Sequence, residues 1–97
     1  MTRVIFADSA LRDIEDIWCF LSLASDHAAE RVVESVVSRC ERIADAPRQG
    51  RARDDLFPVV RAVAHMRFVI LYTVRDGKVH VMRVVHGARD LDALLPT

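Results

Sequence analysis

The sequence is poor in the residues that break or cross-link a chain. It has three glycines, three prolines and two cysteines among 97 residues, while 52% of the residues are hydrophobic. This composition favours a packed fold over a disordered chain. No apolar run reaches the roughly 18–20 residues that a membrane span needs. The start, MTRVIFADS, has an aspartate where a signal peptide needs apolar residues. We therefore expect a single domain over residues 1–97, with no indication of export.

Cysteine and histidine lack the spacing of a metal or redox site. Cys19 and Cys40 lie far apart without a Cys-x-x-Cys pattern, and both fall within helical patterns. Since free cysteine behaves as a small buried hydrophobe, we expect both to be packed in a reduced, cytoplasmic protein. The four histidines have no zinc-like spacing, and no glycine-rich loop is present to cradle a phosphate. We therefore expect neither a metal nor another cofactor.

The charges cancel in total but are unevenly divided along the chain. Up to Pro47 there are five basic and nine acidic residues, a charge of −4, and the remainder has nine basic and five acidic residues, a charge of +4. An anionic partner would meet the arginine-rich second half. The alternative is that the two halves neutralise each other within the fold.

The first half predicts one short strand and two amphipathic helices. RVIFA, residues 3–7, is typical of a strand, after which Asp8 or Ser9 can cap a helix; Ser25 or Asp26 can cap the next. Apolar residues then recur at helical spacing. They are Ala10, Ile14, Ile17 or Trp18, and Leu21 in the first helix, and Ala29, Val32, Val36, Cys40 and Ile43 in the second. The following PRQGRARDD is typical of a polar loop.

The second half predicts strands over residues 59–64, 68–74 and 79–85, which are rich in β-branched and aromatic residues. Asp76-Gly77 favours a two-residue hairpin between the last two. After Gly87, ARDLDALL is typical of a short terminal helix or tail. The order β-α-α-β-β-β predicts an α+β fold, with an N-terminal strand and a two-helix hairpin packed on a mainly antiparallel sheet.

An unbroken ladder from that hairpin would place Ile70 opposite Arg83 and Arg67 opposite His86, an assignment that a one-residue bulge would reverse. We assign the more apolar face to the helices; it comprises Phe68, Ile70, Tyr72, Val74, Val79, Val81, Arg83 and Val85. Arg83 is the exception on this face, and we expect it to pair with a helix carboxylate, either Asp13 or Asp16.

Several segments together resemble the ParE toxins of the RelE/ParE superfamily. They are Asp13 and Ile17 in the first helix, Pro47, Gly50, Arg51, Arg53, Leu56 and Arg61, then RFVILYTV and RVVHGARD. The resemblance covers about residues 4–94. It implies the toxin half of a bacterial type II toxin–antitoxin system that poisons DNA gyrase, and a ParD-like antitoxin that wraps a segment around the toxin. We expect no membrane partner and no direct sequence-specific binding of nucleic acid.

The expected site is a binding surface rather than a catalytic one. Arg67, His86 and Arg89 would form the centre of a basic rim, which Arg51 and Arg53 would extend unless they are simply solvated loop residues. An acidic antitoxin segment would fold on binding there and lay apolar side chains beside the helices.

Two alternatives stay open. The related RelE branch cleaves mRNA on the ribosome with arginines and a tyrosine around the scissile phosphate. This chain keeps one such arginine as Arg89, but has Val69 and Leu95 where that branch has an arginine and the tyrosine. His86 and Arg89 would be the acid–base candidates of a rearranged site. The other alternative is an antitoxin-binding module without toxicity.

Overall fold

A computed structural model of the protein describes residues 3–87, 90 and 94. Its elements follow the expected α+β order. They are β1 (Val4–Phe6), α1 (Asp8–Ser22), α2 (Asp26–Asp45), a 3-10 turn η1 (Pro47–Gln49), β2 (Arg51–Ala52), β3 (Arg61–His65), β4 (Phe68–Arg75) and β5 (Lys78–His86). The strand β2 falls in the segment expected to be a loop. Most of the C-terminal helix or tail expected after Gly87 lies outside the described residues.

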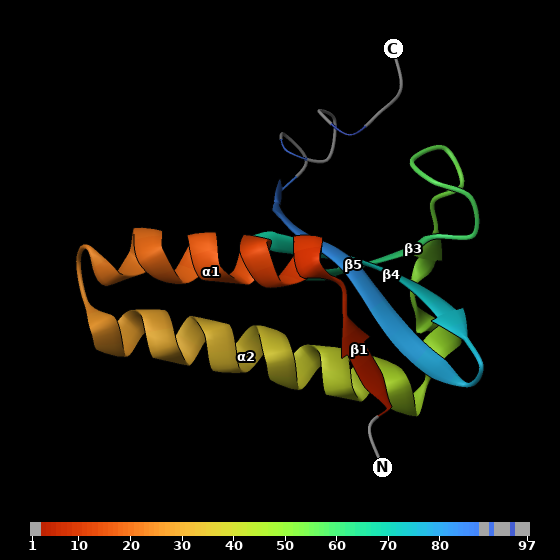
Figure 1. Cartoon of the computed structure of the whole chain (residues 1–97), viewed down its shortest axis with the longest axis horizontal. Coiled ribbons are helices and arrows are strands. Elements are labelled where there is room, and N and C mark those ends of the chain that lie inside the picture. Colours follow the sequence, from red (N-terminus) through yellow and green to blue (C-terminus); the bar gives the residue numbers. More distant parts are fainter. Residues whose placement is uncertain (1–2, 88–89, 91–93, 95–97) are drawn as a thin grey trace.

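The strands form one sheet in the order β1-β5-β4-β3-β2 (Figure 1). All neighbours are antiparallel except β1, which runs parallel to β5. Asp76 and Gly77, with φ of 54° and 72°, form the tight hairpin between β4 and β5, as expected for a turn that needs positive φ at both positions. The sheet is therefore mainly antiparallel, as the sequence predicts.

The helix starts differ in how they are capped. Ser25 caps α2, and its side chain accepts a hydrogen bond from the amide of Ala28 at 3.1 Å. The expectation that Asp8 or Ser9 caps α1 is wrong, because the N-cap is Ala7 and it makes no side-chain bond. Ser9 instead donates its hydroxyl to the carbonyl of Met82 at 2.6 Å. This hydroxyl therefore ties α1 to β5.

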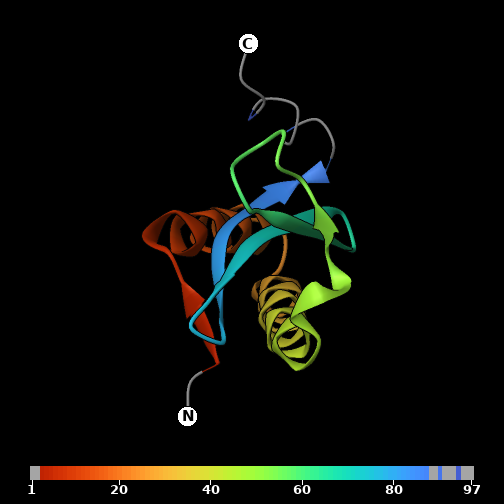
Figure 2. The same ribbon diagram turned by 90° about the vertical axis from the view of Figure 1, so that its right-hand side faces the viewer.

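The two sheet faces bury separate apolar clusters. The larger cluster lies between the helices and the sheet, where α2 crosses the strands (Figure 2). Its buried members are Ala10, Val36, Cys40, Ile43, Val63, Phe68, Ile70, Tyr72, Val79, Val81 and Val84. On the opposite face, the segment between β2 and β3 supplies Leu56 and Val60, which pack on Leu71 and Val85. The second face is thus covered by the chain's own peptide.

A β-bulge changes the expected register of the last two strands. The pairing is regular from Arg75↔Lys78 to Tyr72↔Val81, then shifts so that Leu71 pairs with Arg83 and Phe68 with His86. The expected pairings of Ile70 with Arg83 and of Arg67 with His86 are therefore wrong. Beyond the bulge the faces exchange: Val84 joins the helix-facing core, while Val85 packs on the other side.

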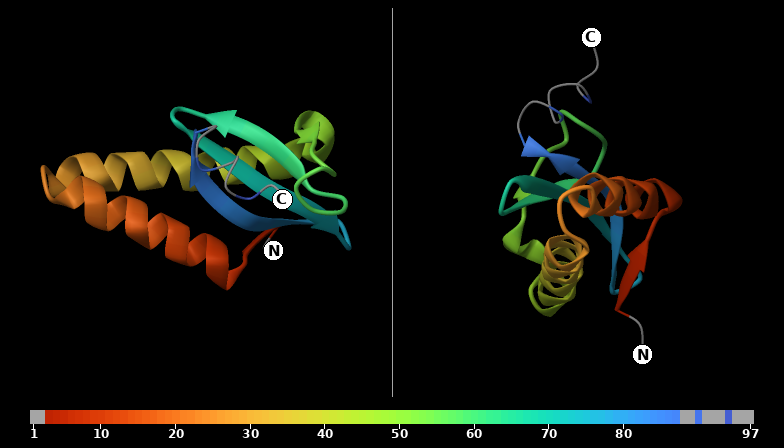
Figure 3. Two further views of the ribbon diagram at one scale, coloured as in Figure 1. Left: turned by 90° about the horizontal axis from the view of Figure 1, so that it is seen from above. Right: turned by 90° about the vertical axis from the view of Figure 1, so that its left-hand side faces the viewer.

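The closed end of the helix hairpin lies beyond the sheet (Figure 3). Large apolar side chains there remain in solvent: Phe20 is 74% exposed and Leu23 is 85% exposed. Cys19 is also exposed, so the expectation that both cysteines are packed holds only for Cys40. In the described part of the chain, no helix has the length and apolarity that crossing a membrane requires.

Candidate functional site

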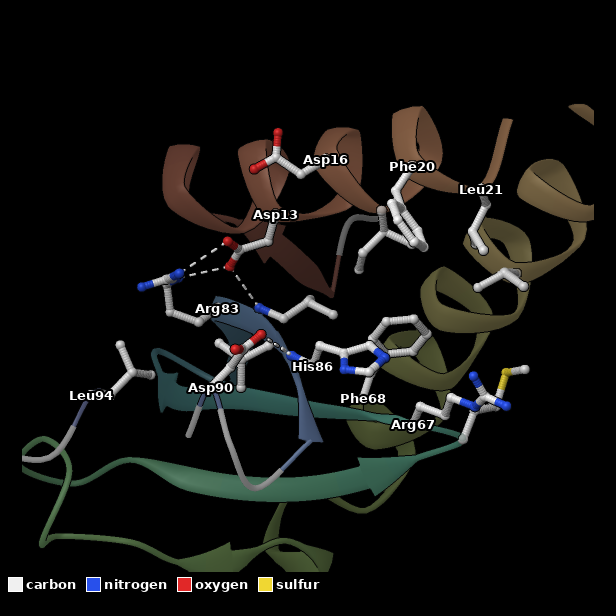
Figure 4. Close-up of a pocket in the computed structure, with 15 residues that line it drawn as sticks. Asp13, Asp16, Phe20, Leu21, Arg67, Phe68, Arg83, His86, Asp90 and Leu94 are labelled. Carbon is white, nitrogen blue, oxygen red and sulfur yellow. Dashed lines mark hydrogen bonds and ion pairs between the residues drawn. The ribbon is translucent and has the colours of Figure 1, made fainter. Parts of the chain in front are cut away.

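A groove of about 860 Å³ opens between α1, the end of β5 and the turn that joins β3 to β4 (Figure 4). Its lining is mainly apolar with charged groups at the margins. The lining residues are Asp13, Asp16, Ile17, Phe20, Leu21, Val32, Met66, Arg67, Phe68, Arg83, Val84, Val85, His86, Asp90 and Leu94. A concave, apolar surface of this size with a few polar groups is the usual form of a binding site.

Asp13 fixes one end of the groove. Its carboxylate accepts two hydrogen bonds from the Arg83 guanidinium, at 2.7 and 3.0 Å, and a third from the amide of Val84 at 2.9 Å. Asp13 and Asp16 were the two expected partners of Arg83, and the structure shows Asp13. The hydrogen bonds from Arg83 to Asp13 raise the pKa of Arg83.

His86 and Arg67 both line the groove. The ring of His86 meets that of Phe68 edge-on, with the ring centroids 5.5 Å apart and the planes at 80°. The His86 amide donates to the Asp90 carboxylate at 3.2 Å. Arg67 is exposed in the turn after β3. Across the groove from Phe68 lie Phe20 and Leu21 of α1 (Figure 4), so Arg67 and His86 flank an apolar wall.

The other candidates of the expected rim lie elsewhere. Arg51 is exposed on β2, and Arg53 pairs with Asp55 through two hydrogen bonds of 2.9 and 2.8 Å. Neither lines the groove. Arg89 lies outside the described residues. Among the described candidates, the structure thus brings together Arg67 and His86, with the Asp13–Arg83 pair at the far end of the same groove.

Phe20 is the groove residue of α1 that the apolar spacing did not identify. Phe20 lies off the apolar stripe that packs on the sheet, yet it is a large aromatic residue on a short helix. An aromatic residue outside the core-facing stripe was the available signal, since exposed apolar residues that gather mark interaction surfaces.

A second polar arrangement lies between α2 and β3. The Ser35 hydroxyl and His65 Nε2 are 2.7 Å apart. Burial, followed by the charges of Arg42 and Arg39, lowers the pKa of His65. The neutral imidazole is therefore favoured, and it holds the end of β3 to α2. Across residues 3–87, 90 and 94, no three His, Cys, Asp or Glu side chains gather as metal ligands would.

A family comparison agrees with this architecture. Residues 4–91 match the family model described as the ParE toxin of the type II toxin–antitoxin system, parDE. The chain belongs to the ParE toxin family. The match spans nearly the whole chain and includes both sides of the groove, and it confirms the resemblance identified from RFVILYTV and RVVHGARD.

Individual relatives carry related names. Toxin RelE2 of Caulobacter vibrioides is 30% identical over 92% of this chain and 99% of its own. Toxin ParE1 of Mycobacterium tuberculosis is 29% identical over 94% of this chain and 95% of its own. A solved chromosomal ParDE toxin–antitoxin system from P. aeruginosa has the same fold, with a TM-score of 0.73, 19% identity, and coverage of 90% of this chain and 97% of that one.

Proposed function

We propose that this ParE-family toxin inhibits DNA gyrase by binding it in the bacterial cytoplasm, and that a ParD-like antitoxin neutralises it by filling the groove beside α1. The observation that carries the proposal is the form of the groove itself. Its walls are apolar side chains, and its charged groups lie at the margins. Such a surface suits an amphipathic segment that presents apolar anchors and acidic side chains.

The size of the groove and the charge at its margin support an antitoxin as the occupant. The groove volume of about 860 Å³ suits several side chains of an inserted segment. Arg67 lies at its margin and is exposed, so its guanidinium can bind a carboxylate of the partner. A segment that folds on binding gains most when its apolar residues enter such a site. The solved relative is described as a ParDE system, which also favours a ParD-like partner.

The antitoxin site is tested by changing Arg67 and Arg89 together to Glu. The double variant should bind the antitoxin at least about tenfold more weakly, since two cation–carboxylate contacts become repulsive. The matched control is Arg12→Glu, which reverses an exposed charge on α1 outside the groove. Equal antitoxin affinity of the double variant and the control would remove this groove as the antitoxin site.

Gyrase inhibition is tested with purified gyrase and supercoiled plasmid. The chain should stabilise cleaved DNA complexes in the presence of ATP, and prior incubation with the antitoxin should abolish the effect. A chain that leaves both supercoiling and DNA cleavage unchanged, while still binding its antitoxin, would contradict gyrase as the target.

Ribosome-dependent cleavage of mRNA is the second candidate. One relative is named Toxin RelE2, and His86 and Arg89 are the acid–base candidates. The edge-on packing of His86 against Phe68 favours a structural part for this ring in the groove wall. We therefore expect His86→Ala to keep its toxicity, as long as the variant remains folded. Loss of toxicity together with loss of RNA cleavage would favour the second candidate.

A further inference from the structure

Met66 has a backbone conformation that its side chain does not favour. Its φ is 57°, in the left-handed region where residues with a Cβ are uncommon. Asp76 has a similar φ of 54°, but aspartate tolerates this region because its short polar side chain bonds locally. Methionine has no such compensation. The turn between β3 and β4 therefore carries strain that glycine would relieve.

Burial of the Met66 side chain does not offset this backbone strain. Met66 is 64% exposed and belongs to neither buried cluster. Among the described residues, its side chain makes one weak polar contact: Sδ lies 3.7 Å from the Ser35 hydroxyl, whose stronger partner is His65 at 2.7 Å. This contact places the thioether beside α2, at the margin of the groove that Met66 lines.

We propose that Met66 is a specificity contact for the antitoxin, and that the Met66-Arg67 pair selects a segment with a large apolar side chain next to a carboxylate. This inference rests on the proposed antitoxin partner. Met66 differs from the equally strained Val59 in lining the groove, and strained backbone that lies in a binding surface is a candidate for a functional contact. The flexible thioether packs well against aromatic and branched side chains.

Charge identifies the other half of the recognition element. Arg67 follows Met66 and also lines the groove, and it makes no hydrogen bond or ion pair to any other residue that the structure describes. A guanidinium in this position favours a carboxylate. The two neighbouring side chains thus offer an apolar and a cationic contact to one partner segment, which an acidic, amphipathic antitoxin segment complements.

Val59 provides a matched control for the strain. Its φ is 55°, and it is 78% exposed, yet it lies in the segment between β2 and β3, outside the groove. Replacing either residue by glycine should relieve a comparable backbone strain. We expect Met66→Gly and Val59→Gly each to raise the melting temperature by about 2–5 °C. A lower melting temperature for Met66→Gly would overturn the premise that Met66 is strained.

Antitoxin affinity should differ between the Met66 and Val59 variants. The probe is the purified ParD-like antitoxin of the proposed function, titrated calorimetrically into each variant. Met66→Gly should bind about tenfold more weakly, because a buried apolar contact is lost. Met66→Leu, which keeps the apolar contact, should bind within about threefold of the unmodified chain. Val59→Gly should bind as the unmodified chain does.

The outcomes distinguish this inference from the proposed function. Equal affinities of Met66→Gly and the unmodified chain would overturn the role of Met66 and leave the antitoxin site standing. A loss as large in Val59→Gly would assign the effect to the backbone rather than to the Met66 side chain, and would also overturn the role. Failure of the unmodified chain to bind the probe would overturn the antitoxin partner and this inference together.

Discussion

The carboxylate of Asp13 accepts a hydrogen bond from the amide of Val84 at 2.9 Å, although the two residues are 71 positions apart in the chain. Asp13 thereby takes the place that a strand carbonyl would have on the outer edge of β5. Four residues earlier, Ser9 donates to the carbonyl of Met82 on the same edge. Side chains on one side of α1 therefore make hydrogen bonds with backbone groups of β5 beyond the end of β1. The bulge that places His86 in the groove wall lies at the same position.

Removing the Asp13 carboxylate should weaken this junction. We expect Asp13→Ala to lower the free energy of unfolding by about 2–3 kcal/mol, because Arg83 and the Val84 amide lose their acceptor in a partly buried site. Asp16→Ala, on the exposed side of the same helix, should change it by less than about 0.5 kcal/mol. Urea denaturation of both variants measures the difference; equal stabilities would show that the ion pair contributes nothing to folding.

The buried Tyr72 hydroxyl should stabilise the turn after α2. It donates to the carbonyl of Pro47 at 2.6 Å and accepts from the amide of Gly50 at 3.0 Å. Tyr72→Phe would leave both backbone groups without this partner, so it should cost about 1–3 kcal/mol of unfolding free energy in thermal denaturation.

A side chain at Gly50 should also disturb this contact. A Cβ there would collide with the Tyr72 hydroxyl and would lie 2.9 Å from two ring carbons. Gly50→Ala should therefore destabilise the fold, although its φ of −73° is accessible to alanine. If Gly50→Ala and Tyr72→Phe both melt as the unmodified chain does, the close packing of this turn is wrong.

Acid should destabilise the fold partly through His65. Burial and the nearby Arg42 and Arg39 hold the pKa of His65 below its ordinary value of 6.5. Below pH 6.5 the unfolded chain binds a proton that the folded chain resists, so stability falls as the pH drops from 6.5 through the folded-state pKa. Above pH 6.5 this contribution is fully present. His65→Gln, which keeps an acceptor for Ser35, should lose less stability between pH 7 and pH 5. Parallel acid profiles for both proteins would contradict the assignment.

The two thiols should react at very different rates. Cys19 is exposed, whereas Cys40 is fully buried, and burial raises the pKa of the Cys40 thiol to about 11. Because the thiolate is the reactive form, a disulfide reagent at pH 8 should modify one thiol quickly in the native protein and the second only after unfolding. Cys19→Ser should abolish the fast phase, and two fast thiols in the native chain would contradict the packing of α2.

Local patterns were enough to predict the helices and the β4–β5 hairpin. The stripe Ala29, Val36, Cys40 and Ile43 of α2 is buried as its helical spacing requires. Helical phase could also have separated the cysteines: Cys40 falls on that stripe, whereas Cys19 is five residues from Ile14 and so points away from the stripe of α1. The prediction for Cys19 was wrong because a residue in an amphipathic helix is buried only when it lies on the apolar side.

The bulge in β5 could not be predicted from the hairpin sequence. The register shift lies beside the part of β5 that α1 contacts, and these contacts join Ser9 and Asp13 to residues about 70 positions away. The alternation of apolar and polar residues along a strand contains no information about such distant contacts. The same shift places His86 opposite Phe68 instead of opposite Arg67. A register shift of one residue therefore changed the expected geometry of the site.

The most direct test of the proposed function follows DNA and protein synthesis separately by pulse-labelling, in cells where this chain has just been induced without its antitoxin. Inhibition of gyrase predicts that DNA synthesis falls first and that translation falls later. If translation falls first, the target is mRNA and the gyrase proposal is wrong. If neither falls while the induced chain is folded and abundant, the gyrase proposal is wrong and the alternative of an antitoxin-binding module without toxicity is favoured.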